Sequence, residues 1–364
     1  MTLMKKIFSN PPPDGVTHER YETARRELIA AFSDYPEVAA LYEYGSTTTP
    51  GVSDLDIMVV FRSDLVSSRP ADYVITPDRF PALASLPQGT LMRIPQAAFR
   101  RIHWFDEHIS LRLLYGEETP CEPLDPPMMS ARFLASIVDW LPERTALIVR
   151  LLRRDAIDTT FCLRVLRSCA VTLESAARLT GDAAYADFGP AVQELRANWR
   201  AGREPELIAR MEQGCALGFH ALADVSHRAF SHEESVEGDV SLFPDVHLRF
   251  TRDPRHWTAA QLSAASSDER IVVPVPATLA PHFSYYSRQP GFLAGQMRLQ
   301  AHLSACEPRD PSYRAFLATK MALATECGNF LLRNGFRDGL FRFGFYFKNY
   351  LARAKEIGDP PARA

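Results

Sequence analysis

The residues with the clearest chemical potential lie in one short stretch. An apolar run ends in Gly45-Ser46, and after a spacer of seven residues Asp54 and Asp56 open a second apolar run. Side chains alternate between the two faces of a strand, so both aspartates are predicted to share one face while the residue between them points into the core. Two neighbouring carboxylates suit Mg²⁺, which takes hard oxygen ligands and keeps water and phosphate in its shell.

The turn before the aspartates has the residue types that a phosphate group needs. Gly45 has no Cβ, so the backbone can approach a ligand closely. Ser46 supplies a hydroxyl and a backbone N–H, and Thr47 adds a further donor. Two Mg²⁺ ions roughly 3.5–4 Å apart on the carboxylates would support in-line displacement at phosphorus. The stretch therefore predicts a cation site beside a phosphate-binding turn.

This pattern resembles the signature of the DNA polymerase β-like nucleotidyltransferase superfamily, over roughly residues 15–120. The resemblance implies a nucleotidyltransferase that moves a nucleoside monophosphate from an NTP substrate to an acceptor and uses two Mg²⁺ ions. It assigns the metal to Asp54 and Asp56, and the nucleotide to Gly45, Ser46, Thr47 and Arg112.

The family also implies a third carboxylate on a later strand. The best candidate strand covers residues 108–115, and there Ser110 stands where an acid is expected. Asp106 lies an even number of residues before Ser110, so its side chain would point to the same face of the strand. It is the predicted third catalytic carboxylate and would act as general base for the acceptor hydroxyl. His108 is the other group able to take a proton, because the imidazole pKa lies near neutrality. The same parity places Arg112 on this face.

The elements that would position these residues can be read from periodicity. Residues 18–32 are predicted to form a helix and residues 38–44 the strand that leads into the turn. Together they predict the α+β class, with a mixed nucleotidyltransferase sheet flanked by helices. A proline-rich segment at 120–127 marks a domain boundary. Helical periodicity follows over residues 131–153, 159–180, 190–199 and 204–230, with a break at 187–190.

Three domains are therefore predicted. They are a catalytic domain at 1–120, a helical bundle at 128–231 and a C-terminal α+β region of unknown role at 238–364. The last contains strand-like segments at 240–243, 246–251 and 270–277, and helices at 313–334 and 340–353. Prolines confine the third of these strands to a sheet edge.

Composition narrows the class of protein. The chain is 46% hydrophobic and 23% charged, with a net charge of −3 and no run of Lys and Arg. This argues against a nucleic-acid partner, because phosphate-backbone binding needs clustered cations. No secretory leader or apolar stretch of about twenty residues is visible, so a cytoplasmic location without membrane contact is expected. The six cysteines lack Cys-x-x-Cys spacing and are predicted to be reduced and mostly buried.

The expected acceptor is a hydroxyl of a small molecule, with pyrophosphate as the leaving product. Alternatives are an enzyme that adenylylates a protein, a nucleotide-binding or regulatory protein of the same fold with weakened turnover, and a glycosyltransferase that uses its Asp-x-Asp pair. A hairpin turn with two solvated carboxylates is the non-functional reading of the motif. Whether identical copies assemble stays open.

Overall fold

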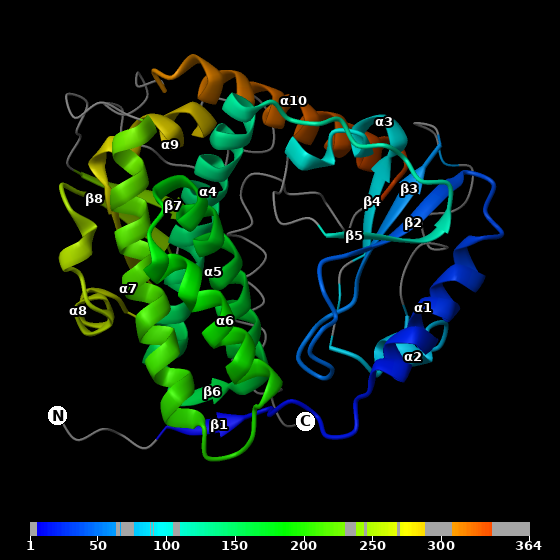
Figure 1. Cartoon of the computed structure of the whole chain (residues 1–364), viewed down its shortest axis with the longest axis horizontal. Helices are drawn as coiled ribbons and strands as arrows, with labels where there is room; N and C mark the ends of the chain where they lie inside the picture. The colour runs from blue at the N-terminus through cyan, green and yellow to red at the C-terminus, as the bar shows by residue number, and fades with distance from the viewer. Residues whose placement is uncertain are drawn as a thin grey trace. The chain divides into compact units, whose positions relative to one another are not determined.

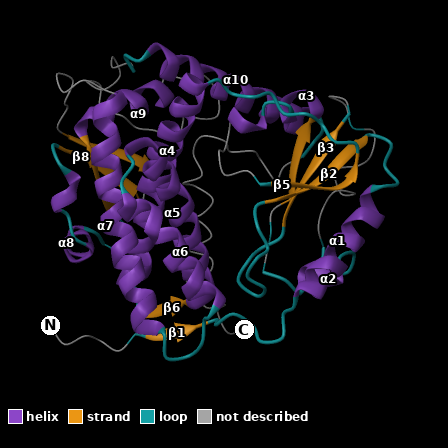
Figure 2. Cartoon of the chain, in the orientation of Figure 1, coloured by secondary structure: helices purple, strands orange, loops and turns teal. Residues whose placement is uncertain are grey.

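The computed structural model describes residues 6–62, 66, 76–87, 89, 91–104, 110–229, 238–243, 246–267, 270–287 and 308–336. It shows a mixed α+β chain (Figures 1 and 2). The chain divides into two compact units. The sheet unit consists of Pro12–Asp125 and Ala318–Gly344, and the helical unit of Met1–Pro11, Pro126–Leu317 and Phe345–Ala364. One helix, α10 (Pro311–Arg333), contributes residues to both.

The sheet unit is built on four strands in the order β4-β3-β2-β5 (Figure 1). β2 runs antiparallel to β3 and β5, and β3 runs parallel to β4. Besides part of α10, its elements are α1 (His18–Phe32), β2 (Val38–Tyr44), β3 (Asp56–Phe61), α2 (Pro81–Ala84), β4 (Leu91–Pro95), α3 (Gln96–Phe99), the 3₁₀ helix η2 (Ile102–Trp104) and β5 (Leu111–Gly116).

Alternation along the strands gives this sheet an apolar core on each face. The first core contains side chains of α1 together with Leu41, Ile57, Val59 and Phe61. The second contains side chains of α3 together with Tyr42, Met58, Val60 and Ile94. Later residues of α10 enter both cores, among them Leu323, Cys327, Phe330 and Leu331.

The helical unit is centred on α4, which packs against α5 and α7, while α6 packs against α5 (Figure 1). A parallel pair, β1-β6, and a three-stranded sheet, β7-β8-β9, complete it. Its elements are β1 (Ile7–Ser9), α4 (Pro126–Arg153), β6 (Ala156–Asp158), α5 (Thr159–Thr180), α6 (Ala183–Ala197), α7 (Glu204–Ala229), β7 (Gly238–Phe243), β8 (Val246–Thr251), η4 (Pro254–His256), α8 (Ala259–Ala265), β9 (Ile271–Pro276), η5 (Ala277–Leu279), α9 (Ala280–Ser287) and the start of α10.

A buried polar chain ties three helices of this unit together. His282 of α9 lies between Asp139 of α4, 2.9 Å from its Nε2, and the Tyr313 hydroxyl of α10, 2.7 Å from its Nδ1. All three side chains are buried, so each needs these partners to offset its desolvation. The contact fixes the first turn of α10 within the helical unit.

Several predicted elements have the expected bounds. α1, β2 and α5 span 18–32, 38–44 and 159–180, as the periodicity indicated. The Asp158 carboxylate accepts a hydrogen bond from the third residue of α5, and Gly181 ends the helix at φ 77°. β9 lies at a sheet edge, as its prolines required.

The predicted helix break at 187–190 is wrong, because α6 runs through Pro190. Its buried side chains Tyr185, Phe188, Val192 and Leu195 form one helical face. Burying each stabilises the fold by about 1.5–3 kcal/mol, which together exceeds the cost of about 3 kcal/mol for an interior proline.

The chain also divides differently from the three domains predicted. The boundary at 125/126 falls in the proline-rich segment, but the region 238–317 belongs to the helical unit and 318–344 to the sheet unit. The predicted helix at 340–353 lies outside the described residues. Within the described ranges, no helix has both the length and the apolarity that a membrane crossing requires.

The described cysteines form no disulfide. Cys162, Cys169, Cys215 and Cys327 are buried, and Cys121 is half-buried. Burial raises the pKa of Cys169 to about 12, so its thiol stays protonated and behaves as a small apolar group.

Candidate functional site

The turn after β2 begins with a glycine whose backbone no other residue adopts readily. Gly45 has φ +87°, in the left-handed region. A Cβ built on it would meet nothing within 4 Å, so its requirement is conformational and not one of space. Its N–H donates to the Ser110 carbonyl oxygen at 2.9 Å, which ties the turn to the start of β5 and removes this amide from ligand binding.

The next three residues leave their backbone donors available. Within the described part of the chain, the amides of Ser46, Thr47 and Thr48 donate no hydrogen bond. Ser46 and Thr48 are exposed, and the Ser46 hydroxyl donates to Thr48 Oγ1 at 3.1 Å. Consecutive N–H groups without partners after a left-handed residue suit an anion.

The rest of the turn is closed by its own hydrogen bonds. The Ser53 amide donates to the Thr49 carbonyl at 2.8 Å, and the Tyr21 hydroxyl of α1 donates to the Ser53 carbonyl at 2.5 Å. The Gly51 amide in turn donates to the Tyr21 hydroxyl at 3.3 Å. A buried tyrosine therefore holds the segment that leads into Asp54.

Asp54 and Asp56 lie at the start of β3, the strand that follows the turn. β3 starts at Asp56, and Asp54 precedes it. Leu55 and Ile57 are buried in the core that contains α1. Alternation then directs both aspartates to the opposite side of the chain, where both are half-buried. The structure brings the predicted carboxylate pair to the base of the Gly45 turn.

β5 does not present the face that was predicted. Tyr44 lies opposite Asp56 on β3 and opposite Leu111 on β5. Glu43, one residue earlier, lies opposite Arg112. Directly opposite residues of antiparallel strands share a face, so Asp56 and Leu111 share one face and Arg112 lies on the other. The prediction that Arg112 lies on the same face of the sheet as the two aspartates is therefore wrong.

The pairing of β5 with β2 sets this arrangement. β5 begins at Leu111, so Ser110 is the exposed residue before the strand and contacts Gly45 through its backbone. Asp106 and His108 lie outside the described residues. Among the described residues, no group of three His, Cys, Asp or Glu is arranged to hold a metal.

A buried ion pair behind the turn was not anticipated from the sequence. Arg25 of α1 and Glu43 of β2 form a double hydrogen bond, Nε to Oε2 and Nη2 to Oε1, both at 2.8 Å. Thr47, predicted to bind nucleotide, places its hydroxyl on this pair. A glutamate in the middle of an apolar strand, Leu41 to Tyr44, was the available signal, because a buried charge requires a partner.

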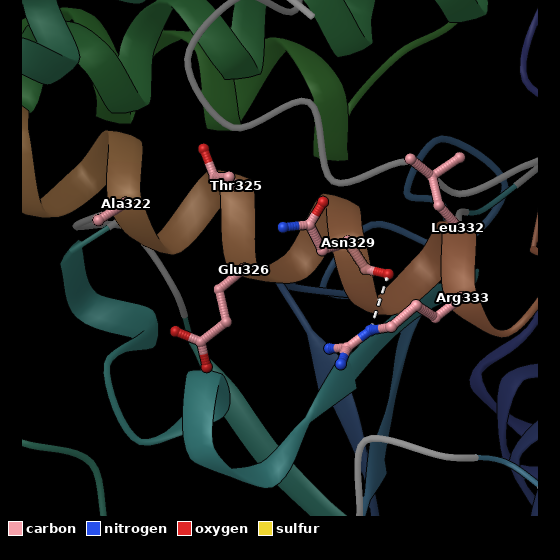
Figure 3. Close-up of a pocket in the computed structure, with 6 residues that line it drawn as sticks. All are labelled: Ala322, Thr325, Glu326, Asn329, Leu332 and Arg333. Carbon is pink, nitrogen blue, oxygen red and sulfur yellow. Dashed lines mark hydrogen bonds between the residues drawn. The ribbon is translucent and has the colours of Figure 1, made fainter. Parts of the chain in front are cut away.

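A pocket also lies along α10 in the sheet unit, away from the turn in sequence (Figure 3). Its lining residues are spaced three and four positions apart and lie along one face of the helix (Figure 3), and Arg333 Nε donates to the Asn329 carbonyl at 3.3 Å. Glu326 is paired with Arg101 at 2.6 Å. None of the predicted site residues lines it; the lining residues are Ala322, Thr325, Glu326, Asn329, Leu332 and Arg333.

Comparisons with known proteins add no assignment: no protein-family model, no curated protein and no solved structure matches the chain.

Proposed function

We propose that the chain is a Mg²⁺-dependent nucleotidyltransferase that moves a nucleoside monophosphate from an NTP to a hydroxyl of a small-molecule acceptor. The observation that carries the proposal is the pairing of two elements. Three available amides, at residues 46–48, follow the left-handed Gly45, and Asp54 and Asp56 open the next strand. A phosphate-binding turn and a carboxylate pair on adjacent antiparallel strands are the parts that phosphoryl chemistry requires.

In this proposal the backbone amides of the turn bind phosphate and the two carboxylates bind the metal ion. The amides of residues 46–48 would bind the β- and γ-phosphate oxygens. Asp54 and Asp56 would hold Mg²⁺, whose bound form neutralises phosphate charge and lowers the barrier to displacement. The two carboxylates fit this cation, because they are half-buried oxygen donors on the side of the chain away from the α1 core. Positioning then supplies most of the remaining rate enhancement.

Charge supports a small acceptor over a nucleic acid. Net charge is −3. Arg25, which contacts Thr47 of the turn, and Arg112 both lie beside Glu22 and Glu43. These four charges cancel, so they give the turn no basic surface for a phosphate backbone.

One observation favours a second candidate, a nucleotide-binding protein of this fold without turnover. Ser110 faces Gly45 where the family pattern implies an acid nearby, and it contributes a backbone carbonyl. Binding of nucleotide would then depend on the same turn and carboxylates, and only the base for the acceptor hydroxyl would differ.

Substitution of the carboxylates tests the proposal. Asp54→Ala and Asp56→Ala should each lower Mg²⁺-dependent pyrophosphate release by on the order of 100-fold or more, because phosphate charge is no longer neutralised. Asp34→Ala, at an exposed aspartate after α1, is the matched control and should retain activity. Full activity in both site variants would overturn the assignment.

The same assay separates the alternatives. Release is measured with each NTP, Mg²⁺ and a panel of hydroxyl-bearing metabolites. Nucleotide-induced thermal stabilisation without pyrophosphate would favour the binding protein, and label transfer to a protein would favour a protein acceptor. Hydrolysis of a sugar nucleotide would favour the glycosyltransferase reading of the Asp-x-Asp pair.

A further inference from the structure

A charged pair is buried directly behind the candidate phosphate turn. The side chains of Arg25 and Glu43 are 6% and 5% exposed, and two hydrogen bonds of 2.8 Å join them. Removing two charges from water is costly, and only good geometry with additional hydrogen bonds offsets the cost. The two side chains therefore fix each other in position, and they also fix any further group that hydrogen-bonds to them.

Thr47 is the residue of the turn that this pair holds. Its hydroxyl accepts a hydrogen bond from Arg25 Nη2 at 2.7 Å and donates to Glu43 Oε1 at 3.0 Å. A threonine hydroxyl has one proton, so donation to Glu43 uses its whole donor capacity. The Thr47 side chain thus faces the ion pair, while its backbone amide remains available.

We propose that Arg25 and Glu43 are positioning residues that act through Thr47 to hold the amides of residues 46–48 in a phosphate-binding arrangement. This inference rests on the proposed function. It gives Thr47 a different role from the one the sequence suggested: its hydroxyl anchors the turn from behind, and its backbone faces the ligand. Preorganised amides bind a phosphate more tightly because little ordering remains to be done on binding.

Electrostatics separates this role from direct attraction of phosphate. Glu22 lies 2.8 Å from Arg25, and Arg112 lies 3.7 and 3.8 Å from Glu22 and Glu43. Two positive and two negative charges leave the group neutral. Its contribution to binding is therefore geometric, and it should persist at salt concentrations that screen surface charges.

The experiment uses the full chain and Mg²⁺-tripolyphosphate as a probe, which needs no knowledge of the base or the acceptor. Affinity is measured by titration calorimetry at low and high salt. Thr47→Val and Arg25→Lys should each weaken binding by about tenfold, because each removes hydrogen bonds that fix the turn. The double variant should bind no more weakly than either single variant, since both act on one network. Thr47→Ser, which keeps the hydroxyl, should restore affinity.

Matched controls are Thr23→Val and Arg26→Lys, the same substitutions at a half-buried and an exposed position on α1 whose side chains bond to each other. Both should leave affinity unchanged. Losses that add in the double variant, or wild-type affinity in Thr47→Val, would overturn the positioning role while leaving the proposed function intact. No binding of the probe by the wild-type chain would overturn both.

A second measurement needs no ligand and decides the matter if Arg25→Lys does not fold. Backbone order parameters of residues 46–48 are compared in phosphate-free wild type, Thr47→Val and Thr47→Ser. We expect them to fall in the valine variant alone. Unchanged values there would show that Thr47 does not order the turn and would overturn the proposal.

Discussion

Glu143 of α4 has no exposed surface, and Arg144 Nη1 lies 3.3 Å from one of its carboxylate oxygens. Neither oxygen has a hydrogen bond among the described residues. Burial raises the pKa of Glu143 to about 7, and the neighbouring Arg144 offsets only part of this rise. The folded chain therefore retains a proton at pH values where the unfolded chain releases it.

This group should make stability depend on pH in a defined direction. Its contribution is complete below pH 4.5, the ordinary pKa of the group, and is lost as pH rises through about 7. The loss is about 3 kcal/mol in the free energy of unfolding. Glu143→Gln cannot ionise, so urea unfolding at pH 4.5 and pH 8 should show a smaller decline than in wild type. Glu194→Gln, at an exposed site on α6, is the control. Equal declines in wild type and Glu143→Gln would contradict the assignment.

At the scale of elements, α6 shows how tertiary packing overrides a local signal. Pro190 is exposed and lies in the middle of the helix, where it lacks the N–H that would continue the hydrogen-bond ladder. The apolar face of α6 against its neighbours keeps the helix continuous. Pro190 therefore lowers the stability of α6, and replacing this one residue should remove the penalty.

Pro190→Ala should raise the free energy of unfolding by about 1–3 kcal/mol, because alanine restores the donor and removes the ring clash. Chemical denaturation measures the change. Pro311→Ala is the matched control: this proline is the first residue of α10, where no hydrogen bond is lost, and no gain is expected. A Pro190→Ala variant no more stable than wild type would mean that α6 has relaxed around the ring.

Physical reasons explain which elements and site residues could be predicted from the sequence and which could not. α1, β2 and α5 were predictable because each contains one unbroken period and identifiable ends. The face of Arg112 was not, because the pairing of both β3 and β5 with β2 places Leu111, and not Arg112, on the same side as Asp56. At the candidate site, Gly45 and the aspartate pair could be located from spacing alone. The partnership of Arg25 with Glu43 depends on a tertiary contact between residues eighteen positions apart.

At the scale of the whole molecule, the sheet unit is assembled from two distant pieces of chain. Residues 12–125 supply its strands, and the later part of α10 supplies Leu323, Cys327, Phe330 and Leu331 to its two cores. Phe336, just beyond the helix, joins the first of these cores. Burying five such side chains contributes about 10 kcal/mol, comparable with the whole stability of a small domain.

A chain of residues 12–125 alone should therefore fail to fold, although the motif and its strands are complete. Amide dispersion in a heteronuclear NMR spectrum measures this directly. Adding a peptide of residues 318–336 should restore dispersion at least in part. A well-dispersed spectrum from residues 12–125 without the peptide would show that α10 is dispensable to this unit.

The divided origin of the sheet unit has a consequence during protein synthesis. The ribosome completes residue 125 long before it reaches the part of α10 that begins at residue 318, and residues 126–317 lie between. At roughly 5–20 residues per second, the interval lasts on the order of tens of seconds. Throughout it, strands β2 to β5 lack the side chains that close their cores. The apolar side chains of the nascent sheet therefore stay incompletely covered until α10 has been synthesised, and slower translation would prolong this exposure.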